Sequence, residues 1–236
     1  YATKGNLNNH IGVPLTILSI DQSYEMAVVE MGANHLGEIA LLCSIANPTH
    51  GFITNIGRAQ IGTFGGFENI IRGKSELYQH LITHNGTVFI NSQNKILANM
   101  AKRFKHPYFY PAKGDYCYAG LVDADPFIRF KTEDEEVVQT QLMGVYNFEN
   151  IAAALCIGKF FGVDSKEANK AVAEYVPGNM RPQIVKKGSN TIILDAYNAN
   201  PSSMEAAIEN LASMKAKKKV VIVGDMFELE EEAAKE

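Results

Sequence analysis

The most informative absences in this 236-residue sequence concern cysteine, basic charge and long apolar runs. Its three cysteines are odd in number, widely spaced and outside any CxxC motif, which favours reduced core thiols over a disulfide framework. A formal net charge of −4 and a pI near 5.9 argue against nucleic-acid binding, because phosphate contacts need a basic face. No apolar run approaches the roughly 18–20 residues of a membrane span, and no signal peptide opens the sequence. We therefore expect a cytoplasmic protein that neither binds nucleic acid nor enters a membrane.

A phosphate-binding P-loop is also missing from the sequence. Gly73-Lys74-Ser75 is similar to the end of GxxxxGK[ST], but the motif needs glycine at the position that Glu68 occupies. The tripeptide also falls inside a predicted helix instead of between a strand and a helix. No other match to the motif occurs, so this chain alone is not expected to cradle triphosphate in the usual way.

What the sequence does contain is a carboxylate at the end of a short apolar run. Ala27–Val29 are flanked by polar residues, a pattern typical of a strand covered on both faces. Glu30 follows directly, and ligands of open α/β sheets collect at the carboxyl ends of strands. An acid there is well placed to hold a metal or a phosphate-bound Mg²⁺. The alternative is that Glu30 is a solvated turn residue.

A lysine on an apolar helix face is the second unusual feature. The spacing predicts a helix over residues 67–82 whose apolar stripe consists of Ile70, Leu77, Tyr78 and Leu81, and Lys74 lies on that stripe. Burial lowers the pKa of a lysine, and the neutral amine can add CO₂ to give a carbamate that ligates Mg²⁺. The alternative is that Lys74 extends its ammonium to the edge of the core.

The remaining pattern predicts an α/β fold with a mostly parallel central sheet flanked by helices and an antiparallel β segment. Its predicted elements are helices over residues 14–20, 38–46, 93–103, 144–161, 167–175 and 201–214, parallel strands over 50–55, 87–91, 191–195 and 220–225, and antiparallel strands within 107–141. A glycine-rich loop follows residue 55. On the helix over residues 38–46 we expect Ile39, Leu42, Cys43 and Ala46 to share one face, and Asn47-Pro48 to end that helix. On the helix over residues 144–161 we expect Ile151, Ala154, Leu155 and Gly158 to share the buried face. The charged cluster at residues 132–136 is expected to form a solvated hairpin tip.

The turn cluster Pro177-Gly178-Asn179 is the expected domain boundary. Because the chain begins with Tyr1 instead of Met and reaches Glu236 within a predicted helix, we expect a piece of a longer protein.

Seven segments, taken together and in this order, resemble the Mur ligases over essentially the whole chain: KGNLNNHIGVPLT, VVEMGANHLGEI, NIGRAQIGTFGG, GKSELY, GVYNFENIAAAL, ILDAYNANPSSMEAAI and VIVGDMFELEEEA. The resemblance implies that residues 1–178 form the central ATPase-type domain, incomplete at its start. Residues 179–236 would then begin a truncated, Rossmann-like C-terminal ligase domain.

The activity that the resemblance implies is ATP-dependent amide ligation in peptidoglycan precursor synthesis. Such an enzyme phosphorylates the terminal carboxylate of UDP-N-acetylmuramoyl-tripeptide. The amine of D-alanyl-D-alanine then displaces phosphate from the acyl phosphate. ATP and Mg²⁺ are the implied cofactors, and the implied protein is a monomer in the bacterial cytoplasm.

The matching motifs also imply roles for particular residues. Glu30 would ligate one Mg²⁺, and Lys74, as a carbamate, would hold the second. The ATP site would draw on both domains through Asn147, Asn150, Arg181, Asp195, Tyr197 and Asn198. Three residues would lie near the substrate channel: Asn6, Asn8 and Asn9. As an alternative without any function, Asn147 and Asn150 would simply cap a helix, and Asn8 or Asn9 would cap the first helix.

The sequence departs from the family at several points. The family's P-loop and its N-terminal domain would precede Tyr1, so we expect this chain by itself not to catalyse ligation. Gln60 stands where the family usually has a metal-binding His, although its carbonyl oxygen suits hard Mg²⁺ acceptably. Tyr146 stands where a His is common.

Three other interpretations of the function stay open. A metal-dependent amidohydrolase could also use a carbamylated lysine, but it needs several His ligands, and the six histidines show no clustered pair. A non-catalytic nucleotide-binding module would bind ATP without releasing phosphate. Another Mur-type ligase would add a different amino compound. Thermal stabilisation by ATP would distinguish a protein that binds ATP from an inert one. Phosphate release would distinguish catalysis from binding alone.

Overall fold

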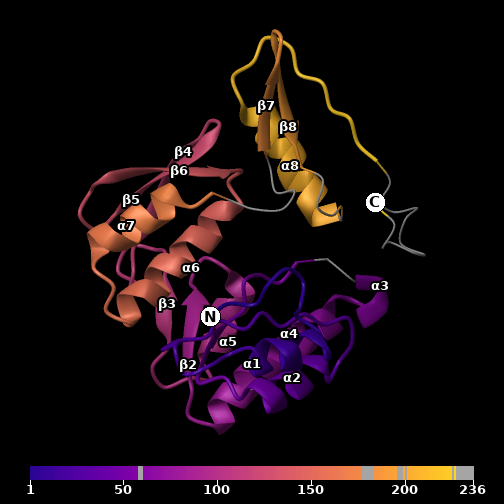
Figure 1. Ribbon diagram of the computed structural model, residues 1–236, viewed down its shortest axis with the longest axis vertical. Helices are drawn as coiled ribbons and strands as arrows, with labels where there is room; N and C mark the ends of the chain where they lie inside the picture. The colour runs from indigo at the N-terminus through magenta and orange to yellow at the C-terminus, as the bar shows by residue number, and fades with distance from the viewer. Residues whose placement is uncertain (58–60, 177–182, 196–198, 200, 225, 227–236) are drawn as a thin grey trace. The chain divides into compact units, whose positions relative to one another are not determined.

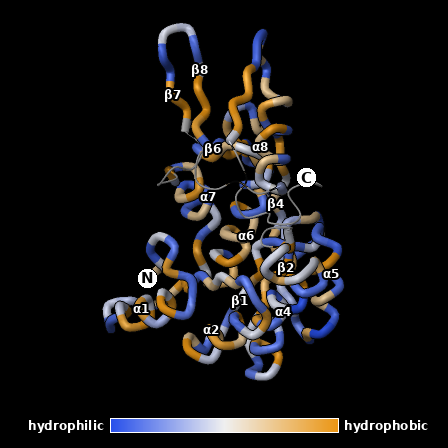
Figure 2. The backbone as a smooth tube through the Cα atoms, turned by 90° about the vertical axis from the view of Figure 1, so that its right-hand side faces the viewer, coloured by the Kyte–Doolittle hydropathy of each residue, from blue (hydrophilic) through white to orange (hydrophobic). Residues whose placement is uncertain are grey.

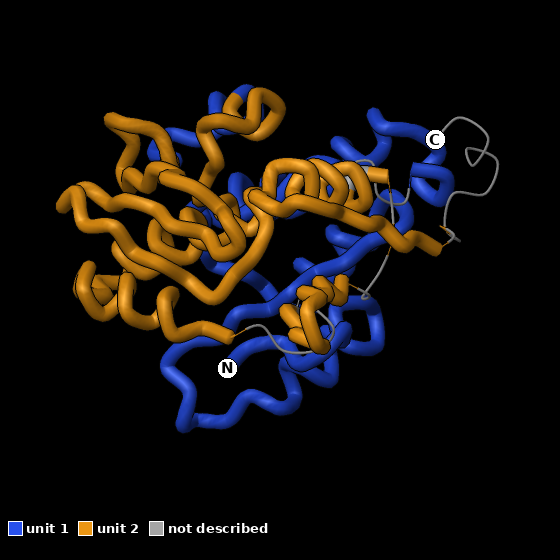
Figure 3. Tube along the Cα trace, turned by 90° about the horizontal axis from the view of Figure 1, so that it is seen from above, with its two compact units in different colours: residues 1–88, 99–107 blue, residues 89–98, 108–236 orange. Residues whose placement is uncertain are grey.

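The computed structural model describes residues 1–57, 61–176, 183–195, 199, 201–224 and 226, and Figure 1 labels its helices and strands. The chain forms two compact units, residues 1–88 with 99–107 and residues 89–98 with 108–236 (Figure 3). Parallel and antiparallel strands alternate with helices, so the expected mixed α/β class is confirmed. None of the described helices has both the length and the apolar character needed to span a membrane.

The first unit is built mainly from helices and contains one short strand. Its elements are α1 (Gly12–Leu18), α2 (Glu38–Ala46), β1 (His50–Phe52), α3 (Ile61–Phe64) and α4 (Phe67–Thr83). Helix α4 is central, because α2, α3 and β1 all pack against it. The glycine-rich segment after Asn55, expected to be an irregular loop, therefore contains the short helix α3.

The apolar faces predicted for α2 and α4 are the buried faces. On α2, Ile39, Leu42 and Cys43 join Val13 of α1 in one core cluster. The left-handed conformation of Asn47 then ends the helix, as the Asn-Pro pair indicates. On α4, the buried members of the predicted stripe are Ile70, Tyr78 and Leu81, while Leu77 is partly buried.

Gly73 has a packing role that accounts for the P-loop-like tripeptide. It lies in the middle of α4, as expected, and is buried. A Cβ atom at this position would come within 2.6 Å of Cε1 of the Phe64 ring. The glycine therefore lets α3 approach α4, and nothing about it requires a phosphate.

A three-stranded sheet in the order β1–β2–β3 includes a pair of parallel strands. Strand β2 (Thr87–Asn91) runs parallel to β3 (Tyr108–Tyr110), and Phe89 lies opposite Tyr108. The prediction that residues 108–110 belong to the antiparallel segment was wrong. They pair with β2 because helix α5 (Lys95–Ala101) makes a crossover that returns the chain in the same direction.

The predicted antiparallel segment forms a meander of three strands. These are β4 (Ala119–Ala124), β5 (Phe127–Thr132) and β6 (Val137–Met143), in that order. The acidic residues 133–136 form the exposed hairpin tip that the sequence predicts. Glu135 pairs with Lys131 of β5, and Glu133 pairs with Lys159 at 3.0 Å.

Helices α6 (Asn147–Phe160) and α7 (Ser165–Glu174) pack against the meander (Figure 1). Helix α6 packs on β3, β5 and α7, and α7 packs on β6. Ile151 and Leu155 are buried as expected, but Ala154 is exposed and Gly158 is only half-buried. The core face is instead completed by Ala152, Ala153 and Cys156, because α6 is enclosed on several sides and its burial does not follow a single stripe.

The strand predicted at Ala27–Val29 does not form. Val28 makes only an isolated parallel bridge with Ala2, and its side chain is 63% exposed. Ala27 is exposed as well, so the run is not covered on both faces. A three-residue apolar run acquires strand geometry only through neighbouring strands, and here residues 1–3 supply one short partner.

The C-terminal part differs from the expected strand–helix–strand order. Strands β7 (Gln183–Lys187) and β8 (Asn190–Leu194) form an antiparallel hairpin that is hydrophilic toward its turn and apolar further along both strands (Figure 2), followed by α8 (Pro201–Ser213). Residues 220–224 form no strand, and Ile222 is 94% exposed. The prediction of a strand over residues 220–225 was therefore wrong for its described part. Apolar β-branched residues favour a strand only where another strand pairs with them, and no described strand does so here. The boundary proposed at Pro177–Asn179 lies outside the described residues and stays a prediction.

Candidate metal and nucleotide site

Glu30 is exposed and is oriented by the N-terminal loop. The side-chain Nδ2 of Asn8 donates a hydrogen bond of 2.9 Å to Oε1 of Glu30. The backbone N–H of Glu30 donates to the hydroxyl of Thr3 at 2.9 Å, and the N–H of Gly32 donates to the carbonyl oxygen of Asn8 at 2.8 Å. Both sides of the carboxylate-bearing segment are thus fixed to residues 3–8.

The close approach of Asn8 requires glycine at position 32. A Cβ atom there would lie 2.9 Å from Nδ2 of Asn8, the atom that binds Glu30. The glycine therefore contributes to the position of the carboxylate without contacting it. Asn8 lies directly beside the predicted metal ligand, and its expected place near a substrate channel stays a prediction.

The other two N-terminal asparagines are placed differently. Oδ1 of Asn9 accepts hydrogen bonds from the N–H groups of Ile11 and Gly12 at 3.0 and 2.9 Å, so Asn9 holds the start of α1. These bonds agree with the alternative that Asn9 supports the first helix, although Ile11, the residue directly before the helix, has no side-chain cap. The helix begins two residues before the predicted Pro14, and the place of Asn9 near a substrate channel stays a prediction. Asn6 is exposed, and its carbonyl oxygen accepts from the N–H of Asn8 at 2.8 Å.

Lys74 is half-buried on α4, and its amine is directed to the segment that follows β1. Nζ donates to the main-chain oxygen of Asn55 at 2.9 Å, at the start of the glycine-rich segment. Burial lowers the pKa of Lys74 below its ordinary value, so a larger fraction of its amine is neutral than on a surface lysine. A neutral amine is the form that adds CO₂. Carbamylation of Lys74 stays a prediction.

Glu76, which the sequence did not single out, holds the N-terminus of α2. Its Oε1 and Oε2 accept hydrogen bonds from the N–H groups of Gly37 and Ala40 at 2.7 and 2.9 Å. The carboxylate thereby satisfies donors that a helix leaves unpaired at its first turn. No local signal reveals this role, because the two partners lie 39 and 36 positions away in the sequence.

The loop between Glu30 and α2 is stabilised by a second carboxylate. Oε2 of Glu38 accepts from the N–H groups of Asn34 and His35 at 2.6 and 3.1 Å. Partial burial opposes ionisation, but these hydrogen bonds prevail and lower the pKa of Glu38. Together with Glu76, Glu38 fixes the chain that follows the predicted metal ligand.

The described side chains offer oxygen ligands but no complete metal cage. Among the residues that the structure describes, no three His, Cys, Asp or Glu side chains are grouped to hold a metal ion. Mg²⁺ commonly takes only one or two carboxylates from protein and the rest from phosphate and water. An oriented Glu30 and an anionic derivative of Lys74 fit that ligand chemistry.

One histidine pair was missed. The rings of His80 and His84, four residues apart on α4, stack with centroids 4.1 Å apart. The expectation that the histidines form no clustered pair was therefore wrong, because residues four apart are neighbours on a helix surface. The pair is still no substitute for the several His ligands of an amidohydrolase.

In the second unit, Asn147 and Asn150 lie side by side at the start of α6. Nδ2 of Asn147 donates to the carbonyl oxygen of Met143 at 2.7 Å, and Nδ2 of Asn150 donates to Oδ1 of Asn147 at 3.1 Å. The residue preceding the helix, Tyr146, forms no side-chain cap, and neither asparagine accepts from an N–H of the first turn in these contacts. Asn150 is exposed, which leaves it accessible to a ligand.

The remaining predicted site residues are placed only in part. Asp195 directly follows β8 and is exposed. Four residues lie outside the described part of the chain: Gln60, Arg181, Tyr197 and Asn198. Their roles at the metal and nucleotide stay predictions.

Comparison with known proteins defines the class to which this fold and site belong. Residues 1–158 match the Mur ligase middle domain, and residues 180–236 match the Mur ligase, glutamate ligase domain. The chain belongs to the Mur ligase family.

Individual relatives narrow the comparison further. The chain is 35% identical over 232 residues to UDP-N-acetylmuramoyl-tripeptide–D-alanyl-D-alanine ligase of Bacillus subtilis (strain 168), covering 97% of this chain and 50% of that protein. A crystal structure of MurF from Acinetobacter baumannii aligns with a TM-score of 0.88 at 31% identity, over 99% of this chain and 52% of that one. MurF ligase from Thermotoga maritima in complex with ADP aligns with a TM-score of 0.84 at 29% identity, over 100% and 55% of the two chains. The chain spans about half the length of the curated relatives it matches.

Proposed function

We propose that the protein to which this chain belongs joins D-alanyl-D-alanine to UDP-N-acetylmuramoyl-tripeptide with hydrolysis of ATP to ADP and phosphate. The similarity to the B. subtilis ligase along 97% of the chain carries this proposal. The orientation of Glu30 by Asn8 supports it, since that contact joins two of the segments that resemble the family.

The proposed reaction has two steps. An oxygen of the tripeptide carboxylate attacks the γ-phosphorus of ATP, ADP leaves, and an acyl phosphate forms. The amine of D-alanyl-D-alanine then attacks the acyl carbon, loses a proton, and phosphate departs with its bridging oxygen. Mg²⁺, which we propose as the metal, neutralises charge on the transferring phosphoryl group when bound.

This chain's own residues have distinct parts in the proposal. Glu30 would ligate the metal, and the hydrogen bond from Asn8 keeps its carboxylate in one orientation. Lys74 would supply the second anionic ligand after carbamylation, which its lowered pKa favours. Asn147 and Asn150 are proposed to contact the nucleotide. A monomeric state and a cytoplasmic location are part of the same proposal.

Phosphate release by the full-length protein tests this function. With ATP, Mg²⁺, the UDP-linked tripeptide and D-alanyl-D-alanine all present, we expect one phosphate for each amide formed. Omitting either the tripeptide or the dipeptide should reduce release to background. Equal release without D-alanyl-D-alanine would contradict the proposal, and product formation only with a different amine would indicate another ligase of the family.

A further inference from the structure

Two of the three cysteines lie against each other in the core of the second unit. Cys156 lies in α6 and is completely buried, and Cys117 lies in the segment between β3 and β4 and is 7% exposed. Both thiols are free, and the thiol of Cys156 donates a hydrogen bond to the sulfur of Cys117. Neither cysteine is among the residues assigned above to the metal, the nucleotide or the substrate.

Contacts on both sides of the pair hold the two cysteines in this arrangement. The backbone N–H of Cys117 donates to the carbonyl oxygen of Phe109 in β3 at 3.2 Å, and α6 packs on the same strand. Lys159, one turn after Cys156, donates from Nζ to the carbonyl oxygen of Tyr116 at 2.7 Å. Helix α6 is thereby attached to the residue directly before Cys117. Two sulfur atoms within hydrogen-bond reach need only a small further approach to form a disulfide.

The surroundings make Cys117 the more acidic of the two thiols. The hydrogen bond from Cys156 lowers the pKa of Cys117, and the ammonium of Lys159 lowers it further. Burial and two nearby carboxylates oppose this shift without cancelling it. The same hydrogen bond, together with burial, raises the pKa of Cys156. The charged and titratable groups near the pair come from β3, the segment before β4, the tip between β5 and β6, and α6: Tyr108, Asp115, Tyr116, Glu133 and Lys159. Because the thiolate is the nucleophilic form, Cys117 is the sulfur that reacts first.

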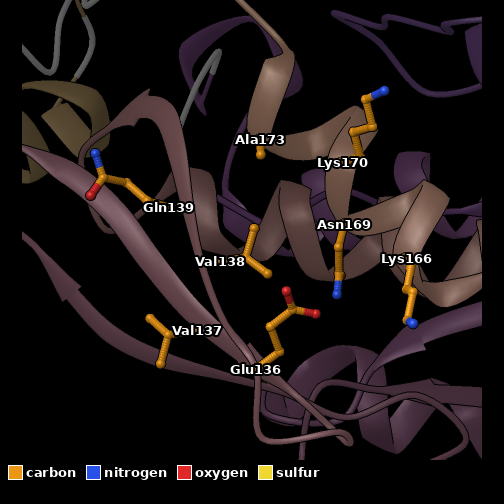
Figure 4. Close-up of a pocket in the computed structure, with 8 residues that line it drawn as sticks. All are labelled: Glu136, Val137, Val138, Gln139, Lys166, Asn169, Lys170 and Ala173. Carbon is orange, nitrogen blue, oxygen red and sulfur yellow. The ribbon is translucent and has the colours of Figure 1, made fainter.

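The burial of the pair limits access to small molecules. Residues 111–117, which include Cys117, form turns and bends and belong to no helix or strand. The pocket that Figure 4 shows is lined by residues 136–139 and by residues of α7, so it offers no route to either cysteine. An oxidant must therefore be small enough to reach the little exposed surface of Cys117 in the turn segment. Hydrogen peroxide meets this requirement, and it reacts with thiolates.

We propose that Cys117 and Cys156 form a peroxide-sensitive dithiol that closes to an intramolecular disulfide. The thiolate of Cys117 attacks one oxygen of hydrogen peroxide, and the O–O bond breaks. The other oxygen leaves as hydroxide and takes up the proton that the thiol released, which leaves a sulfenic acid on Cys117. The sulfur of Cys156 then attacks the sulfenic sulfur, the S–O bond breaks, and the departing hydroxide takes the proton of the Cys156 thiol. The two sulfurs are oxidised, the two peroxide oxygens are reduced, and two water molecules are released.

The test treats the reduced full-length protein with hydrogen peroxide under native conditions and follows intact mass and peptide maps. We expect the loss of two hydrogen atoms and a linked pair of peptides containing Cys117 and Cys156, reversed by dithiothreitol. Cys156→Ala should stop at a sulfenic acid on Cys117, which dimedone traps. If Cys156→Ala does not fold, the peptide map of the parent decides alone. A disulfide through Cys43, or a bond that forms only after unfolding in urea, would overturn the proposal.

A charge variant tests which thiol attacks the peroxide. Lys159→Met removes the cation beside Cys117, so disulfide formation at pH 7 should slow at least about threefold and its pH profile should move to higher pH. Lys131→Met is the matched control, because Lys131 pairs with Glu135 at the neighbouring hairpin tip and does not influence either thiol. It should react at the rate of the parent. Identical rates and pH profiles in Lys159→Met and the parent would refute the assignment of Cys117 as the attacking sulfur.

Discussion

At the scale of single residues, Lys74 is the side chain on which the proposed chemistry depends most. It lies on the apolar face of α4, with its amine directed to the main-chain oxygen of Asn55 and its pKa lowered by burial. We predict that Lys74→Ala lowers the ligase activity of the full-length protein by at least about 10²–10³-fold, the usual cost of losing a positioned electrostatic group. Steady-state phosphate release measures the loss.

Chemical rescue separates a carbamate from a merely structural lysine. Bicarbonate or a short carboxylic acid should restore part of the activity of Lys74→Ala, because a small anion can occupy the space of the missing carbamate. Lys102→Ala, at an exposed position, serves as the control and should keep full activity. Full activity of Lys74→Ala without any additive would contradict the assignment.

Cys43 offers a residue-scale prediction about stability. It is completely buried, and burial together with the charge of Glu76 raises the pKa of its thiol to about 11. The unfolded chain releases this proton near the ordinary value of 9.0, so the stability that Cys43 contributes is complete below pH 9 and is lost as pH rises toward 11.

Urea unfolding at pH 8 and pH 10.5 measures this effect. Between these two pH values the parent should lose about 2 kcal/mol more unfolding free energy than Cys43→Ala does. Comparing pH slopes instead of absolute stabilities removes the constant cost of the cavity. Equal slopes in the two proteins would show that the thiol is not shielded from ionisation.

At the scale of helices and strands, the predictions of buried faces held best for helices that are buried along one stripe. Helices α2 and α4 have apolar residues at regular helical spacing over several turns, and both formed with the predicted buried faces. Short apolar runs carried much less information. Ala27–Val29 and Val220–Val223 both suggested strands, but whether such runs pair depends on neighbours that are distant in sequence.

Glu76 links the two well-predicted helices, and its removal should cost measurable stability. Glu76→Ala leaves the N–H groups of Gly37 and Ala40 without their acceptor. We expect the unfolding free energy to fall by about 1–2 kcal/mol, as for loss of a helix cap. Urea unfolding at neutral pH measures the change.

Glu68→Ala provides the comparison on the same helix. Glu68 is exposed in the first turn of α4 and takes no part in holding α2, so its loss should cost only a few tenths of a kcal/mol through the helix dipole. If both variants lose the same amount, the contact with α2 does not stabilise the fold.

At the scale of the whole molecule, the sequence singled out candidate site residues but not the contacts that hold them. Glu30 was recognisable from its place after an apolar run, yet the Asn8 side chain that orients it comes from a loop without periodicity. Asn147 and Asn150 were recognisable as a pair, but their bonds to Met143 and to each other depend on the turn from β6 into α6. Such contacts follow from tertiary structure, which short motifs do not encode.

The most direct measurement of the central claim follows one oxygen atom through the reaction. The full-length protein is given ATP, Mg²⁺, D-alanyl-D-alanine and UDP-linked tripeptide whose terminal carboxylate carries ¹⁸O at both oxygens. Formation of an acyl phosphate predicts that the released phosphate contains one ¹⁸O atom for each amide bond formed, detectable by mass spectrometry. Amide formation with unlabelled phosphate would contradict the proposed mechanism, and absence of amide product would contradict the proposed function itself.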